Sequence, residues 1–165
     1  MKMLSTVVAA VAMMAAAGSV SAQSFSPSSG SFSASGNVAL LNSAGATCNV
    51  SLGGTIASSS LINITSKTFS PGPSITCGWA VTPYSTWHAE TIPGNYNQIV
   101  IYLGANTIIG TPCKGWVVAD VVNLPSGGSE IIFDNDELID GTYAGGTPTG
   151  CYVVSGSVVS NVQLI

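Results

Sequence analysis

The strongest constraint on the fold of this chain is an alternation of apolar and polar residues that glycine and proline interrupt every few positions. In the first clear example, Phe32, Ala34 and Val38 fall on one side of an extended chain. β-Branched residues dominate such segments, and no stretch after residue 22 has the apolar spacing of an amphipathic helix. The pattern predicts an all-β fold.

Turn-forming residues divide this region into about nine short strands. The expected strands span 32–40, 48–52, 61–69, 77–81, 87–92, 98–103, 116–122, 130–133 and 152–164. Residues 134–141 form an acidic turn in this assignment. Short strands at this spacing predict a β-sandwich or a partly open barrel. No linker of domain-boundary length divides residues 32–165, so we expect a single domain.

The first 22 residues have the layout of a secretory signal peptide. Lys2 supplies a basic start, residues 7–18 form an apolar run, and Val20-Ser21-Ala22 is a small-residue cleavage site. We therefore predict a helical signal peptide over 1–22, a flexible arm rich in Ser, Pro and Gly over 23–31, and the folded domain over 32–165. Export places the mature chain in the periplasm or, as we favour, outside the cell or at its surface, where disulfides persist.

After removal of the signal peptide the chain keeps two lysines, no arginine and seven acidic residues, a formal net charge of −5. So few cations cannot neutralise many phosphates, which excludes nucleic acid as a partner and disfavours adhesion to anionic lipid. No second apolar run reaches transmembrane length, so we expect no membrane-spanning segment in the mature chain. Ser, Thr, Asn and Gly supply the polarity, as in secreted adhesins, filament subunits and matrix proteins.

Four cysteines, Cys48, Cys77, Cys113 and Cys151, lie in the mature chain. We expect two disulfides, because no pair has the C-x-x-C spacing of a zinc site and the chain has a single histidine. Four cysteines allow three pairings, and the sequence leaves the choice open. We favour the nested pairing, with Cys77–Cys113 inside Cys48–Cys151, whose outer bridge would close a long loop between the second and last strands.

The single histidine, His88, lies close to Ser85 and Glu90 in the sequence. Neighbours along one strand do not form a catalytic triad, and the chain has no G-x-S-x-G turn. We therefore predict a non-enzymatic protein that has no catalytic residues and needs no cofactor.

The one dense charge cluster, residues 134–141, offers oxygen ligands for Ca²⁺ in Asp134, Asp136 and Asp140. It departs from the EF-hand pattern, because Ile139 occupies the position of the required glycine. We favour a solvated turn over a metal site here, since charge in a turn keeps a nearly uncharged protein from self-association.

Several aromatic residues are candidates for binding. Tyr84, Trp87 and Tyr96 lie in turn-rich sequence that contains proline, so we expect them to be exposed, and a patch formed by them would be the best binding candidate. Trp79 and Trp116 each lie two or three residues from a cysteine, which predicts packing against a disulfide.

Two segments carry a family resemblance. The first half of the chain contains FSASGNVAL (32–40) followed by TCNVSLGGTI (47–56), and a strand that starts with a cysteine ends the chain at 151–165. These segments resemble the small secreted bacterial proteins called protein activators of alkane oxidation. The resemblance implies an extracellular, non-catalytic protein that promotes growth on hydrocarbons or acts at the biofilm surface, and it brings no catalytic residues with it.

The resemblance and the composition support two functional hypotheses. In the first, a secreted β-sandwich contacts hydrocarbon or the cell surface and assists hydrocarbon access without turning over a substrate. In the second, the chain associates with copies of itself as a structural subunit of an extracellular filament or biofilm matrix. It would then add the arm at 23–31, or its final strand, to the open sheet edge of a neighbour.

Overall fold

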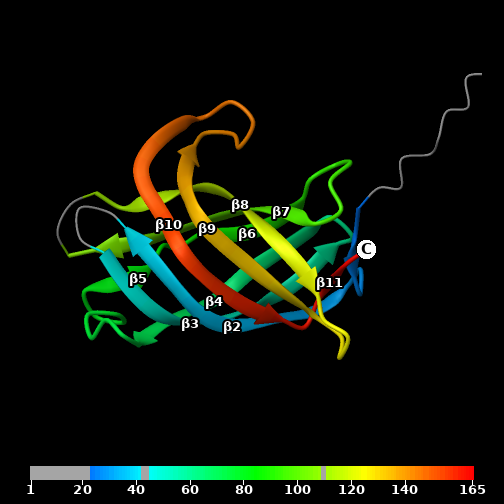
Figure 1. The fold of residues 1–165 in the computed structure, drawn as a ribbon, viewed down its shortest axis with the longest axis horizontal. Coiled ribbons are helices and arrows are strands. Elements are labelled where there is room, and N and C mark those ends of the chain that lie inside the picture. Colours follow the sequence, from blue (N-terminus) through cyan, green and yellow to red (C-terminus); the bar gives the residue numbers. More distant parts are fainter. Residues whose placement is uncertain (1–22, 42–44, 109–110) are drawn as a thin grey trace, which may run out of the picture.

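The computed structural model describes residues 23–41, 45–108 and 111–165, and the predicted signal peptide lies outside these residues. The described part of the chain is all-β, as predicted, and contains no helix that could span a membrane (Figure 1). In chain order its strands are β1 (Phe25–Ser26), β2 (Gly30–Leu41), β3 (Gly45–Ser58), β4 (Leu61–Pro71), β5 (Val81–Pro83), β6 (Trp87–Thr91), β7 (Gln98–Thr107), β8 (Cys113–Asn123), β9 (Ser129–Asp140), β10 (Thr147–Ser160) and β11 (Gln163–Leu164).

Eight of these strands form a closed antiparallel barrel. Their order around the sheet is β7-β6-β4-β3-β2-β10-β9-β8, and β8 pairs back onto β7 to complete the ring. The short strand β5 continues the sheet along β7, where Val81 lies opposite Thr107. Of the two architectures that the sequence allowed, the chain therefore adopts the barrel, and pairing between β7 and β8 closes it.

Inward-facing side chains from all eight ring strands fill the barrel. Phe32, Ala34 and Val38, which alternation predicted to share an inner face, are all buried in β2. An eight-stranded barrel has an interior just wide enough for side chains to fill it or to hold one small ligand. The apolar residues of the alternating pattern thus face the core, and the polar residues between them face the outside of the barrel.

One end of the barrel is covered by the two ends of the described chain. Strands β1 and β11 pair with each other there, and both Phe25 and Leu164 are buried in the core (Figure 1). The backbone N–H of Phe25 also donates to the carbonyl oxygen of Ser59 in the β3–β4 turn. Residues 23–31, predicted as a flexible arm, are therefore docked and include both β1 and the start of β2.

The two disulfides join Cys48 to Cys77 and Cys113 to Cys151, so two bridges form as predicted but the nested pairing was wrong. The register of the sheet explains why. Cys48 lies opposite Val38, and Val38 lies opposite Gly156, which places Cys151 five residues away along β10. At about 3.3 Å per residue this is a displacement of about 16 Å. A disulfide needs Cα atoms within about 7 Å.

The prediction of an acidic turn at 134–141 was also wrong, because strand β9 continues through this segment to Asp140. Asn135 adopts a positive φ of 53°, and the pairing of β8 with β9 shifts register between Trp116 and Asp120. The acidic segment 134–140 is therefore part of an irregular strand and does not reverse the chain. A bulge or register shift redirects the side chains of a strand without ending the sheet.

Two adjacent glycines in β3 provide a test of the sheet packing. A Cβ on Gly54 would lie 1.9 Å from the backbone oxygen of Asn63, whereas a Cβ on Gly53 would lie 3.5 Å from its nearest neighbour. We expect Gly54→Ala to lower the free energy of unfolding by about 1–3 kcal/mol through overpacking. Gly53→Ala, the matched control, should be neutral or stabilising by a few tenths of a kcal/mol. Denaturant unfolding of both variants measures this, and equal effects would contradict the packing described.

Peptide mapping under non-reducing conditions tests the disulfide pairing. We expect linked peptides that contain Cys48 with Cys77 and Cys113 with Cys151, because these pairs are bridged with Cα atoms 5.6 and 5.7 Å apart. Recovery of a peptide that links Cys48 to Cys151 would contradict the register of β3, β2 and β10.

Candidate functional site

Three large apolar side chains are strongly exposed at the end of the barrel opposite β1 and β11. Ile75, Trp79 and Ile108 have 78%, 64% and 68% of their surface exposed. They lie beyond the end of β4 and the end of β7, at the end of the molecule where β5 lies (Figure 1). We call these three residues the apolar tip.

The loop that carries Ile75 and Trp79 is fastened to β3. The Cys48–Cys77 disulfide joins the two covalently. Beside it, the backbone N–H of Ser74 donates to the carbonyl oxygen of Thr47 at 3.1 Å, and the N–H of Thr47 donates to Ser74 Oγ at 2.8 Å. These links hold the loop in place although its apolar side chains make little contact with the core.

Hydrogen bonds also connect the parts of the apolar tip. The indole Nε1–H of Trp79 donates to the carbonyl oxygen of Ile75 at 3.1 Å. The backbone N–H of Ile108 donates to the carbonyl oxygen of Ala80 at 3.1 Å, so the loop after β7 lies beside the loop after β4. Two loops distant in sequence thus lie side by side, and each carries exposed apolar side chains.

The two loops that form the apolar tip carry no formally charged residue. Residues 68–89 and 91–113 contain no Asp, Glu, Lys or Arg. Moving a charge out of water costs far more free energy than burying an apolar side chain returns. A surface free of charge can therefore enter an apolar phase without that penalty.

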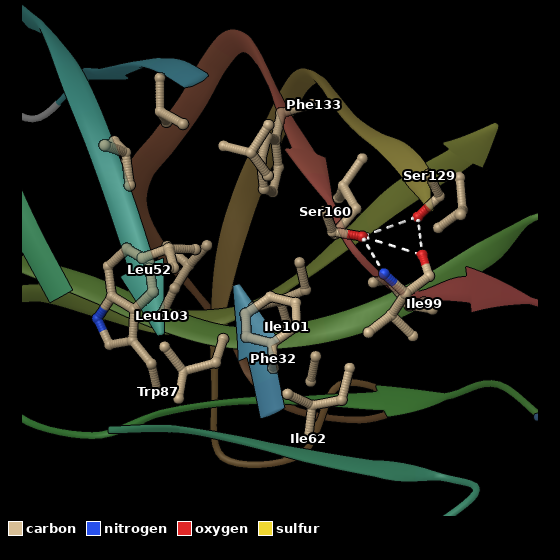
Figure 2. Close-up of a pocket in the computed structure, with 18 of the residues that line it drawn as sticks. Phe32, Leu52, Ile62, Trp87, Ile99, Ile101, Leu103, Ser129, Phe133 and Ser160 are labelled. Atoms are coloured by element: carbon tan, nitrogen blue, oxygen red, sulfur yellow. Dashed lines mark hydrogen bonds between the residues drawn. The ribbon is translucent and has the colours of Figure 1, made fainter. Parts of the chain in front are cut away.

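The barrel interior is the second apolar feature, and it is nearly full (Figure 2). Its cavity measures about 30 Å³ and is lined by side chains such as Phe32, Ile62 and Leu103. A cavity of roughly 150 Å³ is needed to hold even benzene. Near the end covered by β11, Ser129 and Ser160 hydrogen-bond to each other and to the carbonyl oxygen of Val162, so the buried hydroxyls are satisfied. The cavity is therefore much smaller than one known to bind benzene, and the interior is mostly filled by core side chains.

The aromatic patch predicted from the sequence does not form. Trp87 is only 7% exposed and points into the barrel, where its ring lies 6.0 Å from the ring of Phe69 and its indole N–H donates to Gly104. Tyr84 is partly exposed after β5, and Tyr96 is exposed in the β6–β7 loop. The exposure predicted for Trp87 was wrong because this residue starts β6 with its side chain on the inner face.

Trp79 and Trp116 were predicted to pack against disulfides, and neither lies in the core. Trp79 adjoins the bridged loop but is exposed, as described above. Trp116 lies on the outer wall of β8, partly exposed, with its ring near those of His88 and Tyr102. No signal in the sequence located the apolar tip, because the longest stretch without charged residues, 3–66, lies elsewhere in the chain.

In the part of the chain that the structure describes, neither His88 nor the acidic residues bring together the ligands of a metal ion. The Nε2 atom of His88 lies 3.6 Å from Glu90 Oε1 on the outer wall of β6. Among the residues that the structure describes, no three His, Cys, Asp or Glu side chains converge to hold a metal ion, so Asp134, Asp136 and Asp140 do not form a Ca²⁺ site.

Two comparisons complete the description. A family model described as "Alkane oxidation protein activator PraA/PraB-like" matches residues 1–164. Neither the curated proteins nor the solved structures gave a significant match to the chain.

Asp136 generates a pH-dependent prediction. Its pKa is raised above the ordinary 3.8, mainly because the carboxyl group is partly buried. The backbone N–H of Asp134 donates a hydrogen bond to this carboxyl group and lowers the pKa, whereas the negative charges of Asp120 and Asp134 raise it. The folded state then holds this proton more tightly than the unfolded state, so stability is lost as pH rises from 3.8 through the raised pKa.

We therefore expect Asp136→Asn to raise the free energy of unfolding at pH 7 by a few tenths of a kcal/mol, since the carboxyl is partly solvated. The difference should vanish at pH 3, where both states carry the proton. Thermal unfolding of the wild-type chain and the variant at the two pH values measures it. An equal gain at both values would show that the effect is not electrostatic.

Proposed function

Because the family match spans nearly the whole sequence, the chain belongs to the PraA/PraB-like family of alkane oxidation protein activators, and we propose that it is a secreted, non-catalytic protein that acts at the hydrocarbon–water interface. The proposal joins the description of the family as an activator to one feature of the structure, the apolar tip. In this role the protein adsorbs to hydrocarbon and assists its access to the cell without converting it.

The exposure of the apolar tip carries the proposal. Full burial of a large apolar side chain is worth about 1.5–3 kcal/mol. Ile75, Trp79 and Ile108 are each more than half exposed, so transfer of all three into an apolar phase supplies several kcal/mol. The Cys48–Cys77 disulfide fastens the loop that carries Ile75 and Trp79 to β3, which restricts the movement of that loop.

Two disulfides support a location outside the cytoplasm, because such bridges persist in oxidising compartments. Together with the signal peptide predicted over residues 1–22, they favour secretion. We extend this to the extracellular side and the cell surface, where insoluble hydrocarbon is encountered.

The filament hypothesis receives less support from the fold. Every strand of the ring pairs on both sides, and β1 is docked against β11. Strand addition would have to use a segment that the ring leaves unpaired, such as the part of β4 beyond Ile64, which β6 does not pair with, whereas adsorption through the apolar tip needs no new strand pairing.

Interfacial tension at a hexadecane–water boundary tests the proposal. We expect the purified mature chain to lower the tension at micromolar concentration. The triple variant Ile75→Ser, Trp79→Ser and Ile108→Ser should need at least tenfold more protein for the same effect, because it forfeits most of the free energy of apolar transfer.

A matched control carries three substitutions of exposed apolar residues away from the tip, Tyr96→Ser, Val122→Ser and Val159→Ser. It should behave as the wild-type chain. Circular dichroism of each protein confirms the fold before adsorption. Equal loss in both triple variants would remove the assignment to the apolar tip, and an inactive wild-type chain would remove the proposed function.

A further inference from the structure

A second set of aromatic side chains lies on the outside of the barrel. His88, Tyr102 and Trp116 occupy directly paired positions on β6, β7 and β8. The residues before and after each of them in the strand are buried in the barrel, so the three side chains project from the outer wall. Tyr143, in the loop after β9, extends the row beyond Trp116. We call these four residues the aromatic wall.

The rings of the aromatic wall contact one another in a continuous surface. The His88 and Tyr102 rings are stacked with centroids 5.5 Å apart and an interplanar angle of 16°. The Trp116 ring stands nearly perpendicular to His88, with centroids 4.8 Å apart. The Trp116 indole Nε1–H donates to the carbonyl oxygen of Gly141 at 2.9 Å, which orients the ring.

Packing within the barrel does not account for this surface. Outward positions on β2, at Ser33, Ser35 and Asn37, carry small polar side chains. The four residues of the aromatic wall, by contrast, are large and lie outside the core, and each is partly or largely exposed. Partly exposed rings that adjoin one another are a common feature of binding surfaces.

Polar groups of both charges border the aromatic wall. Lys114 Nζ lies 5.0 Å from the centroid of the Tyr84 ring and 3.2 Å from the Tyr84 hydroxyl. At the other side Glu90 lies beside His88. These groups can donate and accept hydrogen bonds, and their opposite charges give the border no strong preference for a charged ligand.

We infer that the aromatic wall is a binding site for neutral polysaccharide, separate from the apolar tip. The C–H groups on one face of a sugar ring carry partial positive charge and pack against the electron-rich face of an aromatic ring. The hydroxyl groups at the edge of the sugar need the donors and acceptors that Lys114, Tyr84 and Glu90 supply. Liquid hydrocarbon fits this surface poorly, because it would have to desolvate those charged groups.

Binding at the aromatic wall would add a second attachment to the proposed function, with one end of the protein on hydrocarbon and its side wall on a glycan. The two sites are made of different residues. Loss of one therefore leaves the other measurable.

Native electrophoresis in gels that contain a polysaccharide tests the inference on the purified mature chain. The acidic protein migrates towards the anode, and we expect hydroxyethylcellulose and galactomannan to retard it. Trp116→Ala should weaken the apparent affinity at least tenfold, and Tyr143→Ala should weaken it several-fold. Because Tyr143 lies in a loop, its removal is the informative variant if Trp116→Ala fails to fold.

Trp79→Ala and Tyr96→Ala are the matched controls, and both should be retarded as the wild-type chain is. Adsorption of Trp116→Ala to hexadecane should remain unchanged, which separates this inference from the proposed function. The inference is overturned if the wild-type chain migrates freely in both gels, if Trp116→Ala and Tyr143→Ala bind as the wild type does, or if only a gel containing the acidic polymer alginate retards the chain.

Discussion

The pairing of β7 with β8 is the interaction on which the rest of the structure depends. It turns a sheet with two open edges into a ring in which each strand is hydrogen-bonded on both sides. Closure gives every strand one inner and one outer face, and eight strands leave an interior that side chains fill. Because the interior is occupied, contacts with other molecules are left to the ends of the barrel and to its outer wall.

The two ends of the barrel are built differently. At one end β1 and β11 bury Phe25 and Leu164 and seal the core. At the other end the Cys48–Cys77 disulfide fastens to β3 a loop whose Ile75 and Trp79 side chains are exposed. The protein thus seals its core at one end and exposes three large apolar side chains at the other.

The strand segments were predictable because alternation is a local property, and Phe32, Ala34 and Val38 lie on the inner face as expected. The placement of two tryptophans was not, although Tyr96 is exposed as expected. Trp87 was expected outside and lies in the core, whereas Trp116 was expected against a disulfide and lies on the outer wall. Proximity to proline or cysteine in the sequence says little about which face of a strand a side chain takes, and that face decides its exposure.

From the residues alone came the β class, the presence of two disulfides and the resemblance to a family that the match over residues 1–164 bears out. The fold added the closure of the barrel, the pairing of Cys48 with Cys77, and the gathering of Ile75, Trp79 and Ile108 at one end. The division has a physical cause. The alternation of apolar and polar residues depends only on neighbours in the sequence. The register and the order of the strands in the ring depend on hydrogen bonds between strands that are far apart in the chain.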